Sequence, residues 1–176
     1  MEYLDRSELR RLFEVAYKCN KTHHLAMLTG LAHGLRISEL LAIRGTDISK
    51  GYLTVKRLKG SKKTCQPIVR SDDVLFDCSS ILELAKTKGD GVLFNWSRQY
   101  MDVLFKKYGS MAGIHPNKCH SHAAMKHSLA MSLWSETHSV GDIQNYLGHR
   151  AASSTMCYLY EANAEKVQNA VANIKW

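Results

Sequence analysis

The chain has 176 residues, of which 45% are hydrophobic, and a formal net charge of +8. This length is sufficient for one domain with its own core, and the composition excludes a chain that is disordered throughout. The positive charge favours an acidic polymer such as nucleic acid as a partner, although a basic protein without that partner fits the charge alone equally well.

The cysteines and the apolar segments set the expected compartment. Five cysteines are scattered along the chain without C-x-x-C spacing, namely Cys19, Cys65, Cys78, Cys119 and Cys157. This pattern favours a reduced cytoplasmic setting, in a bacterial cytosol or nucleoid or an infected host cell, over a disulfide framework. There is no signal peptide and no long apolar run, so we expect neither secretion nor a membrane span.

Hydrophobic spacing and turn residues predict the order of the elements. In chain order, we expect helices at 7–18, 22–33 and 39–44, strands at 52–58 and 64–69, a helix at 79–87, an extended piece at 92–94, a helix at 98–108, a loop at 109–121, and helices at 122–136, 139–147 and 153–173. Gly34 is expected to close the second helix, and Ser38 to cap the third. The predicted fold class is therefore mainly α with a small antiparallel β-sheet (α+β), in a single domain.

Two segments of the first half carry candidate phosphate ligands. Arg36 lies between Gly34 and a helix start, where its guanidinium can form a fork on phosphate oxygens while nearby backbone amides add positive potential. A surface arginine at a helix cap is the alternative. The expected hairpin tip, residues 57–63, is rich in lysine and can reach into a DNA groove, or can be an ordinary solubilising turn.

The segment His120–Ser128 places several titratable side chains at the start of one expected helix. Cys119, His120, His122 and His127 cluster there, but no second group at zinc spacing accompanies them, so we predict no metal site. His127 fits a packed helix histidine better than a ligand.

The most informative segment runs from Leu147 to Tyr158. A turn at Gly148 is followed by His149, and Tyr158 comes nine residues later in an expected helix. This arrangement can hold a phenol beside an imidazole on a rigid support, as a covalent nucleophile requires. Tyr160 is a rival nucleophile, but the two side chains point about 200° apart on a helix, and the spacing from His149 favours Tyr158.

As an ordered set, these segments resemble the tyrosine recombinase, or phage integrase, family over residues 5–165. The family's first box is matched by Gly34–Leu40, its hairpin lysine by Lys59, and its L-G-H motif by Leu147–His149. Its second box, His-x-x-Arg-His-Ser/Thr, is matched at its last three positions by Lys126–Ser128. The resemblance implies a tyrosine recombinase catalytic-domain-like fold over 1–176, without the family's N-terminal core-binding domain.

Two departures from the family pattern affect the second box. Lys126 replaces the second arginine, which keeps the charge but loses the bidentate fork. Ala123 stands where a histidine is expected, and His122 is its neighbour. His122 reaches the site if the helix begins with a looser turn; otherwise the chain lacks one acid–base group.

The resemblance implies a metal-independent and ATP-independent mechanism without cofactors. Tyr158 would attack a DNA phosphate and form a 3′-phosphotyrosyl link. Arg36, Lys126 and His149 would surround the phosphorus, and Lys59 on the hairpin would be the general acid for the leaving 5′-oxygen. His122 is a candidate for assisting proton transfer, and Glu39 is expected to hold the Arg36 loop.

The implied partners are double-stranded DNA and other copies of the chain, in a synaptic tetramer on DNA. The apolar residues of 162–174 would pack on their own domain or on a neighbouring protomer. Two rival functions remain open: a non-catalytic DNA-binding relative that acts as an architectural or regulatory module, which Ala123 favours, and topoisomerase-like relaxation without strand exchange.

Overall fold

A computed structural model describes residues 2–58 and 60–157 of the chain. In chain order, the elements are α1 (Arg6–Cys19), α2 (Lys21–Ala32), α3 (Ile37–Leu41), the 3₁₀ helix η1 (Gly45–Asp47), β1 (Ile48–Ser49), β2 (Tyr52–Val55), β3 (Thr64–Pro67), α4 (Ile81–Lys88), α5 (Arg98–Met111), the 3₁₀ helix η2 (Pro116–Lys118), the π-helix η3 (His122–His127), α6 (Ser128–Thr137) and α7 (Val140–Leu147). The predicted class, mainly helical with a small antiparallel sheet, is confirmed.

The central element is α2, which contacts α1, α3, η3 and α6. Residues 24–31 of this helix are all buried, as expected for a helix that is apolar on every side. Gly30 permits its close packing, because a Cβ at this position would lie 2.0 Å from the sulfur of Met125 in η3. This contact ties the second-box segment directly to the core helix.

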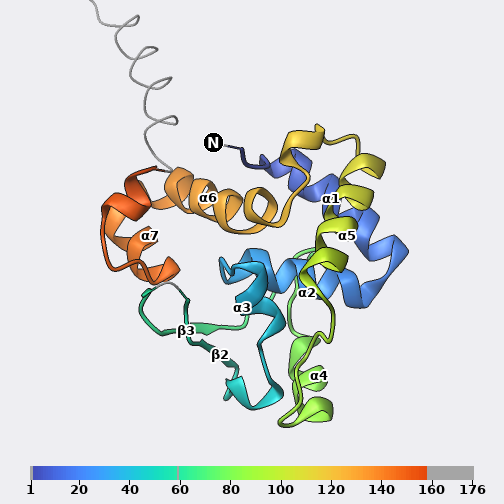
Figure 1. Cartoon of the computed structure of the whole chain (residues 1–176), viewed down its shortest axis with the longest axis horizontal. Helices are drawn as coiled ribbons and strands as arrows, with labels where there is room; N and C mark the ends of the chain where they lie inside the picture. The colour runs from blue at the N-terminus through green and yellow to red at the C-terminus, as the bar shows by residue number, and fades with distance from the viewer. Residues whose placement is uncertain (1, 59, 158–176) are drawn as a thin grey trace, which may run out of the picture.

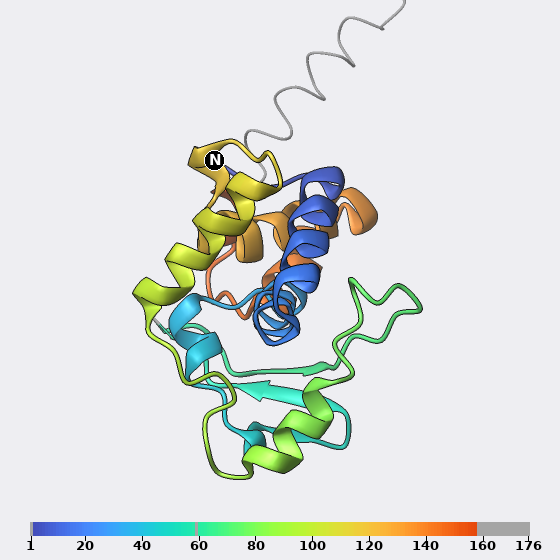
Figure 2. The same ribbon diagram turned by 90° about the vertical axis from the view of Figure 1, so that its right-hand side faces the viewer.

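The sheet has the order β1-β2-β3, and both pairs of strands are antiparallel. Figures 1 and 2 show the sheet and α4 at one end of the molecule, with α1, α5 and α6 toward the other. The segment between β2 and β3 reaches α7, and this brings the hairpin to the turn that precedes His149. Among the described helices, none is long and apolar enough to cross a membrane.

Several predicted boundaries were wrong. The third helix begins at Ile37, with Arg36 rather than Ser38 at its N-cap, because the Glu39 carboxylate accepts the free Arg36 amide. The two-residue strand β1 was missed because so short a strand has no alternation to detect. The expected helix 122–136 is divided into η3 and α6. A helical turn begins at residues 153–157, and the rest of the expected helix 153–173 lies outside the described residues.

Candidate functional site

Arg36 is held at the start of α3 by a carboxylate three residues later. The backbone amide of Arg36 donates to Glu39 Oε2 at 2.9 Å, and its guanidinium Nη1 donates to Glu39 Oε1 at 2.9 Å. Gly34 precedes this turn with a φ of 57°, in the left-handed region that favours glycine. The expectation that Glu39 holds the Arg36 loop is confirmed.

Glu39 is fully buried and has four hydrogen bonds. Besides the two from Arg36, its carboxylate accepts from the backbone amide of Leu58 at 2.9 Å and from the Arg57 guanidinium at 3.3 Å. Burial alone raises the pKa of Glu39, but these hydrogen bonds and the charge of Arg57 outweigh burial and lower it. The carboxylate is therefore ionised at neutral pH, and the groups that hold it use most of its accepting capacity.

Arg57 was assigned from the sequence to the exposed hairpin tip, and this was wrong. Its side chain has no exposed surface, and its guanidinium is directed into the interior. Its hydrogen-bond acceptors are His33 O at 2.7 Å, Thr64 Oγ1 at 2.9 Å, Gly34 O at 3.0 Å, Glu39 Oε2 at 3.3 Å and Gln66 Oε1 at 3.3 Å. Arg57 therefore joins the hairpin to the Arg36 loop. An arginine in a lysine-rich segment carries no sequence signal for this inward orientation.

The hairpin is attached to the site on both sides of its tip. On the β2 side, the Leu58 amide donates to Glu39, and on the β3 side the Lys62 amide donates to Gly148 O at 2.7 Å. Lys59, the candidate general acid, lies between these two anchors in the sequence but outside the described residues. The structure thus places both flanks of Lys59 against the segments that carry Arg36 and His149.

Lys126 is 1% exposed, and its ammonium interacts electrostatically with Arg36, Glu39 and Arg57. Within the part of the chain that the structure describes, its Nζ has no hydrogen-bond partner. Burial is the main cause that lowers its pKa to about 8, and the charges of Arg36 and Arg57 lower it further while Glu39 and Cys157 oppose them. A buried ammonium without a partner is costly, so this position suits an anion supplied by a ligand.

His149 is buried directly after the turn at Gly148. Its Nδ1 lies 2.9 Å from the hydroxyl of Thr155, which is also fully buried. Burial, followed by the charges of Lys126, Arg36 and Arg57, lowers the pKa of His149 to about 4, against the opposite effect of Glu39. His149 is therefore a neutral imidazole at pH 7, and the structure brings it into one electrostatic cluster with Arg36 and Lys126.

His122 belongs to the same cluster, whereas Ala123 does not. The Ala123 side chain is 0% exposed and points into the core, while His122 is exposed and feels the charges of Lys126 and Arg36. Desolvation is the first cause that lowers the pKa of His122, followed by His127, whose ring centroid lies 5.0 Å away, and then by the charges of Lys126 and Arg36.

The π-helix changes the direction of His122 relative to the expected motif, in which the histidine lies three residues before Lys126. In the π geometry seen here, the Ser128 amide donates to Ala123 O, five residues earlier. A turn of this kind holds about 4.4 residues, so four steps from His122 to Lys126 rotate by roughly 330°. Three steps of an α-helix rotate by about 300°, which is the offset of a His-x-x-Arg pair. On the wider π turn, a histidine four residues before Lys126 therefore points in nearly the same direction as a histidine three residues before it on an α-helix.

Tyr158, the candidate nucleophile, lies outside the described residues. Its neighbour Cys157 is described, and the thiol of Cys157 interacts electrostatically with Lys126. Within residues 2–58 and 60–157, no group of three His, Cys, Asp or Glu side chains is placed to hold a metal ion. Arg36, Lys126 and His149 offer cationic and neutral hydrogen-bond donors that suit a phosphate.

Known proteins share this sequence pattern. The profile described as the phage integrase family matches residues 2–165. Tyrosine recombinase XerA of Thermococcus kodakarensis is 30% identical over 169 residues, which cover 88% of this chain and 56% of that protein. XerA of Pyrococcus furiosus is 31% identical over 166 residues, with coverage of 88% and 56%. The chain thus spans a little more than half the length of these curated relatives.

Solved structures share the fold. XerA recombinase superposes with a TM-score of 0.75 at 21% identity, covering 100% of this chain and 65% of that one. XerH site-specific recombinase, bound to a palindromic difH substrate after cleavage, gives 0.76 at 17% identity, covering 98% and 53%. The catalytic domain of bacteriophage HP1 integrase gives 0.67 at 21% identity, covering 100% and 99%.

Proposed function

Because the chain belongs to the phage integrase family, we propose that it carries the catalytic site of a tyrosine-type site-specific recombinase. This site cleaves and rejoins double-stranded DNA through a 3′-phosphotyrosyl intermediate. The observation that carries the proposal is the buried Nζ of Lys126, which lacks a partner within residues 2–58 and 60–157 and lies in one cluster with Arg36 and His149. A DNA phosphate supplies the negative charge that this cluster lacks.

In the proposed reaction, the phenol oxygen of Tyr158 forms a bond to the scissile phosphorus as the bond to the 5′-oxygen breaks. Arg36, Lys126 and His149 stabilise the charge that develops on the phosphate oxygens. Donors aimed at developing charge each contribute about 10²–10³ in rate. The partner strand's 5′-hydroxyl then reverses the step, so the phosphotyrosine conserves the bond energy and no ATP is consumed.

The leaving 5′-oxygen needs a proton, and Lys59 is the donor that the family resemblance supplies. This role is supported by the hydrogen bonds of Leu58 and Lys62, which attach both flanks of the hairpin tip to the site. His122, which interacts electrostatically with Lys126 and Arg36, assists proton transfer. Since the substrate is DNA, the reaction takes place in a bacterial cytosol or nucleoid, or in an infected host cell.

The test is covalent capture of DNA. The protein is incubated with a pool of nicked suicide duplexes whose recognition arms are randomised, and the products are separated on a denaturing gel. We expect a protein–DNA band that is absent in Tyr158→Phe and retained in Tyr160→Phe. Sequencing the DNA in that band identifies the recognised site. Absence of the band in the unmodified chain, at protein concentrations that bind the same pool, refutes the proposal.

The second candidate is a non-catalytic DNA-binding relative, which the replacement of the expected histidine by Ala123 favours. It predicts DNA binding without any covalent band. In both cases DNA affinity falls steeply with salt, because phosphate contacts release counterions. If a band forms, joining of two recovered sites indicates recombination, while relaxation of supercoils without joining indicates topoisomerase-like activity.

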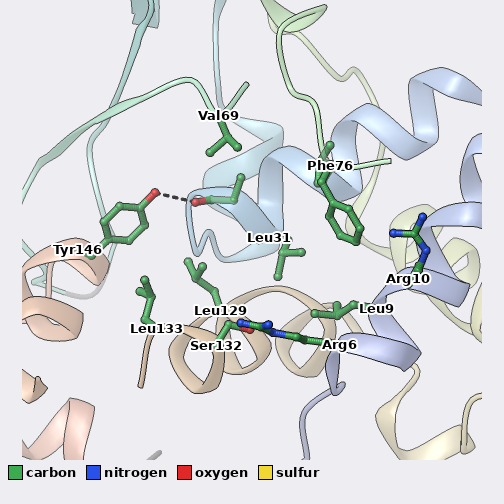
Figure 3. A pocket seen from close by; sticks show the side chains of 12 residues that line it. Arg6, Leu9, Arg10, Leu31, Val69, Phe76, Leu129, Ser132, Leu133 and Tyr146 are labelled. Carbon is green, nitrogen blue, oxygen red and sulfur yellow. Dashed lines mark hydrogen bonds between the residues drawn. The ribbon is translucent and has the colours of Figure 1, made fainter. Parts of the chain in front are cut away.

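Self-association on DNA is proposed as well, in a synaptic tetramer. A solved relative, lambda integrase, is described as a tetramer bound to a Holliday junction. In this chain, an apolar cavity of about 560 Å³ lies among α1, α2, α6 and α7, with Leu31, Leu129 and Leu133 in its lining (Figure 3). The apolar residues of 162–174, which lie outside the described residues, suit such a surface in the same or a neighbouring protomer. Light scattering with and without the recovered duplex measures the assembly.

A further inference from the structure

The π turn of η3 carries two residues of the proposed site, His122 and Lys126. Such turns are rare, and they occur mostly as a single turn within an α-helix. Between these two residues, Met125 packs against α2, where Gly30 leaves room for its sulfur. The contacts that hold the turn therefore decide in which directions His122 and Lys126 point.

Ser128 follows the turn directly and forms two hydrogen bonds to one carbonyl oxygen of it. Its backbone amide donates to Ala123 O, five residues earlier, and its hydroxyl donates to the same oxygen at 2.7 Å. A carbonyl oxygen has two lone pairs and can accept both. In an α-helix, a serine hydroxyl reaches the carbonyl three or four residues earlier. The bond from the Ser128 hydroxyl to Ala123 O therefore favours the π geometry over the α geometry.

The hydroxyl of Ser128 is oriented by a residue 124 positions away in the sequence. The Leu4 amide donates to Ser128 Oγ at 2.8 Å, and both residues are buried. Because Oγ accepts from Leu4, its own single proton is left for Ala123 O. Next to this bond, Nδ1 of His127 donates to Glu2 O at 3.0 Å. The N-terminal segment thus binds the end of the π turn at two successive residues.

The ring contact between His122 and His127 shows how the turn changes side-chain directions. The two ring centroids lie 5.0 Å apart, although the residues are five positions apart in the sequence. Five steps of an α-helix rotate by about 500°, so such side chains point about 140° apart. Five steps of a turn with about 4.4 residues rotate by roughly 410°, which leaves about 50° between them. The ring contact is therefore a marker of the π geometry.

We propose that Ser128 is a positioning residue of the site: its hydroxyl, oriented by the Leu4 amide, fixes the π turn and thereby the directions of His122 and Lys126. Ser128 is 0% exposed, so it acts through these two residues and not on DNA itself. This role rests on the proposed function, and it makes the N-terminal segment a support of the site.

Ser128→Ala tests this role, and Thr29→Val is the matched control. Thr29 is also fully buried, and its hydroxyl donates to Leu25 O at 2.7 Å, but within α2 and not in the π turn. Each variant loses a buried hydroxyl, so both should lower the midpoint of urea denaturation. At saturating recovered duplex, Ser128→Ala should form the covalent complex about 10–10²-fold more slowly, as for misplaced catalytic groups. Thr29→Val should keep the rate of the unmodified chain, and Ser128→Thr, which retains a hydroxyl, should restore most of it.

NMR of the free protein gives a structural measurement that does not depend on cleavage. The nuclear Overhauser effect between the rings of His122 and His127 should be lost in Ser128→Ala and retained in Thr29→Val. Either retention of this effect or an unchanged cleavage rate in Ser128→Ala overturns the proposed role. Equal slowing by Thr29→Val overturns it as well, because the slowing would then follow from lost stability alone.

A milder change removes only the donor that orients the hydroxyl, and it also serves if Ser128→Ala does not fold. Cys19 is exposed at the end of α1, so residues 1–18 can be synthesised and ligated to residues 19–176. An ester in place of the amide between Tyr3 and Leu4 deletes one N–H and no side chain. We expect covalent-complex formation to slow by about five- to tenfold, corresponding to one hydrogen bond.

An unchanged rate in the ester protein would show that Leu4 does not orient the hydroxyl, and this contradicts the proposal. Absence of a covalent band in the unmodified chain defeats the proposed function instead. In that case the ring contact between His122 and His127 still decides whether Ser128 fixes the turn.

Discussion

The amide of Lys62 donates a 2.7 Å hydrogen bond to the carbonyl oxygen of Gly148. This bond joins the β2–β3 hairpin to the turn before His149, two segments that are more than 80 residues apart in the sequence. Gly148 has a φ of 70°, and a Cβ here would lie 2.7 Å from Lys62 O and 2.9 Å from Thr64 Cγ2. The close approach of hairpin and turn therefore requires glycine at position 148, because any side chain there would overlap the hairpin.

Gly148→Ala should separate the hairpin from the turn. We expect a loss of about 1–2 kcal/mol from the left-handed backbone and a further 1–3 kcal/mol from the overlap with the hairpin. Gly113→Ala is the matched control, because its φ is 66° and nothing lies within 4 Å of the added Cβ. Urea denaturation of the two variants isolates the hairpin contact, and equal losses would show that the contact contributes nothing.

Arg57→Met should be among the most destabilising substitutions at the site. It leaves the buried Glu39 carboxylate and the carbonyl oxygens of His33 and Gly34 without their donor. Breaking a buried ion pair in this way costs about 3–5 kcal/mol. Arg10→Met, which removes an exposed pair with Asp73, should cost less than about 1 kcal/mol. Similar denaturation midpoints for the two variants would contradict the role assigned to Arg57.

Thr155→Val tests the orientation of His149. The substitution keeps the shape but removes the hydroxyl 2.9 Å from the imidazole Nδ1. We expect covalent-complex formation to slow by roughly 5–10-fold, corresponding to a hydrogen bond of about 1 kcal/mol. Thr87→Val removes an exposed hydroxyl that donates to a helix carbonyl and should leave the rate unchanged. An unaffected rate in Thr155→Val would mean that the backbone alone orients the ring.

Ala123→His and His122→Ala test the π-helix argument. Since the Ala123 side chain is buried, a histidine there should cost about 1–3 kcal/mol of stability and should not increase cleavage. His122 is exposed, so its removal should leave the unfolding free energy nearly unchanged while slowing cleavage. Denaturation and covalent-complex formation are measured for both variants. Faster cleavage by a stable Ala123→His variant would refute the idea that His122 takes the place of a histidine at position 123.

Acid should destabilise the fold through His33. Burial lowers the pKa of this histidine from 6.5 to about 4. Between pH 6.5 and pH 4, His33 therefore binds a proton in the unfolded chain but not in the folded one. The contribution to stability is complete above pH 6.5 and is lost as the pH falls toward 4, reaching about 3 kcal/mol. Urea denaturation at about pH 7.5 and pH 5 measures the part that is lost in that interval, about 2 kcal/mol. His33→Gln should reduce the difference between the two pH values.

The sequence alone was sufficient for the order of the α-helices and for the hairpin of β2 and β3, although it missed β1 and the π-helix η3. Apolar spacing located the helices around α1, α5 and α7, and the ordered motifs identified Arg36, Lys126 and His149, which the structure brings into one cluster. This works because a helical face is a periodic property of neighbouring residues. The predicted start of the third helix was wrong because the Glu39 side chain accepts the Arg36 amide. The position of Glu39 is fixed by hydrogen bonds from Arg57 and Leu58 as well, and these come from a distant segment.

Only the tertiary structure decided which polar groups have partners. Arg57 and Lys126 are both cations in the printed sequence, yet one has five buried acceptors and the other has none among the described residues. In the same way, the π-helix decided that His122 and not residue 123 faces the cluster. The physical reason is that desolvation and hydrogen bonding depend on atoms brought together from distant segments, and residue spacing along the chain does not record them.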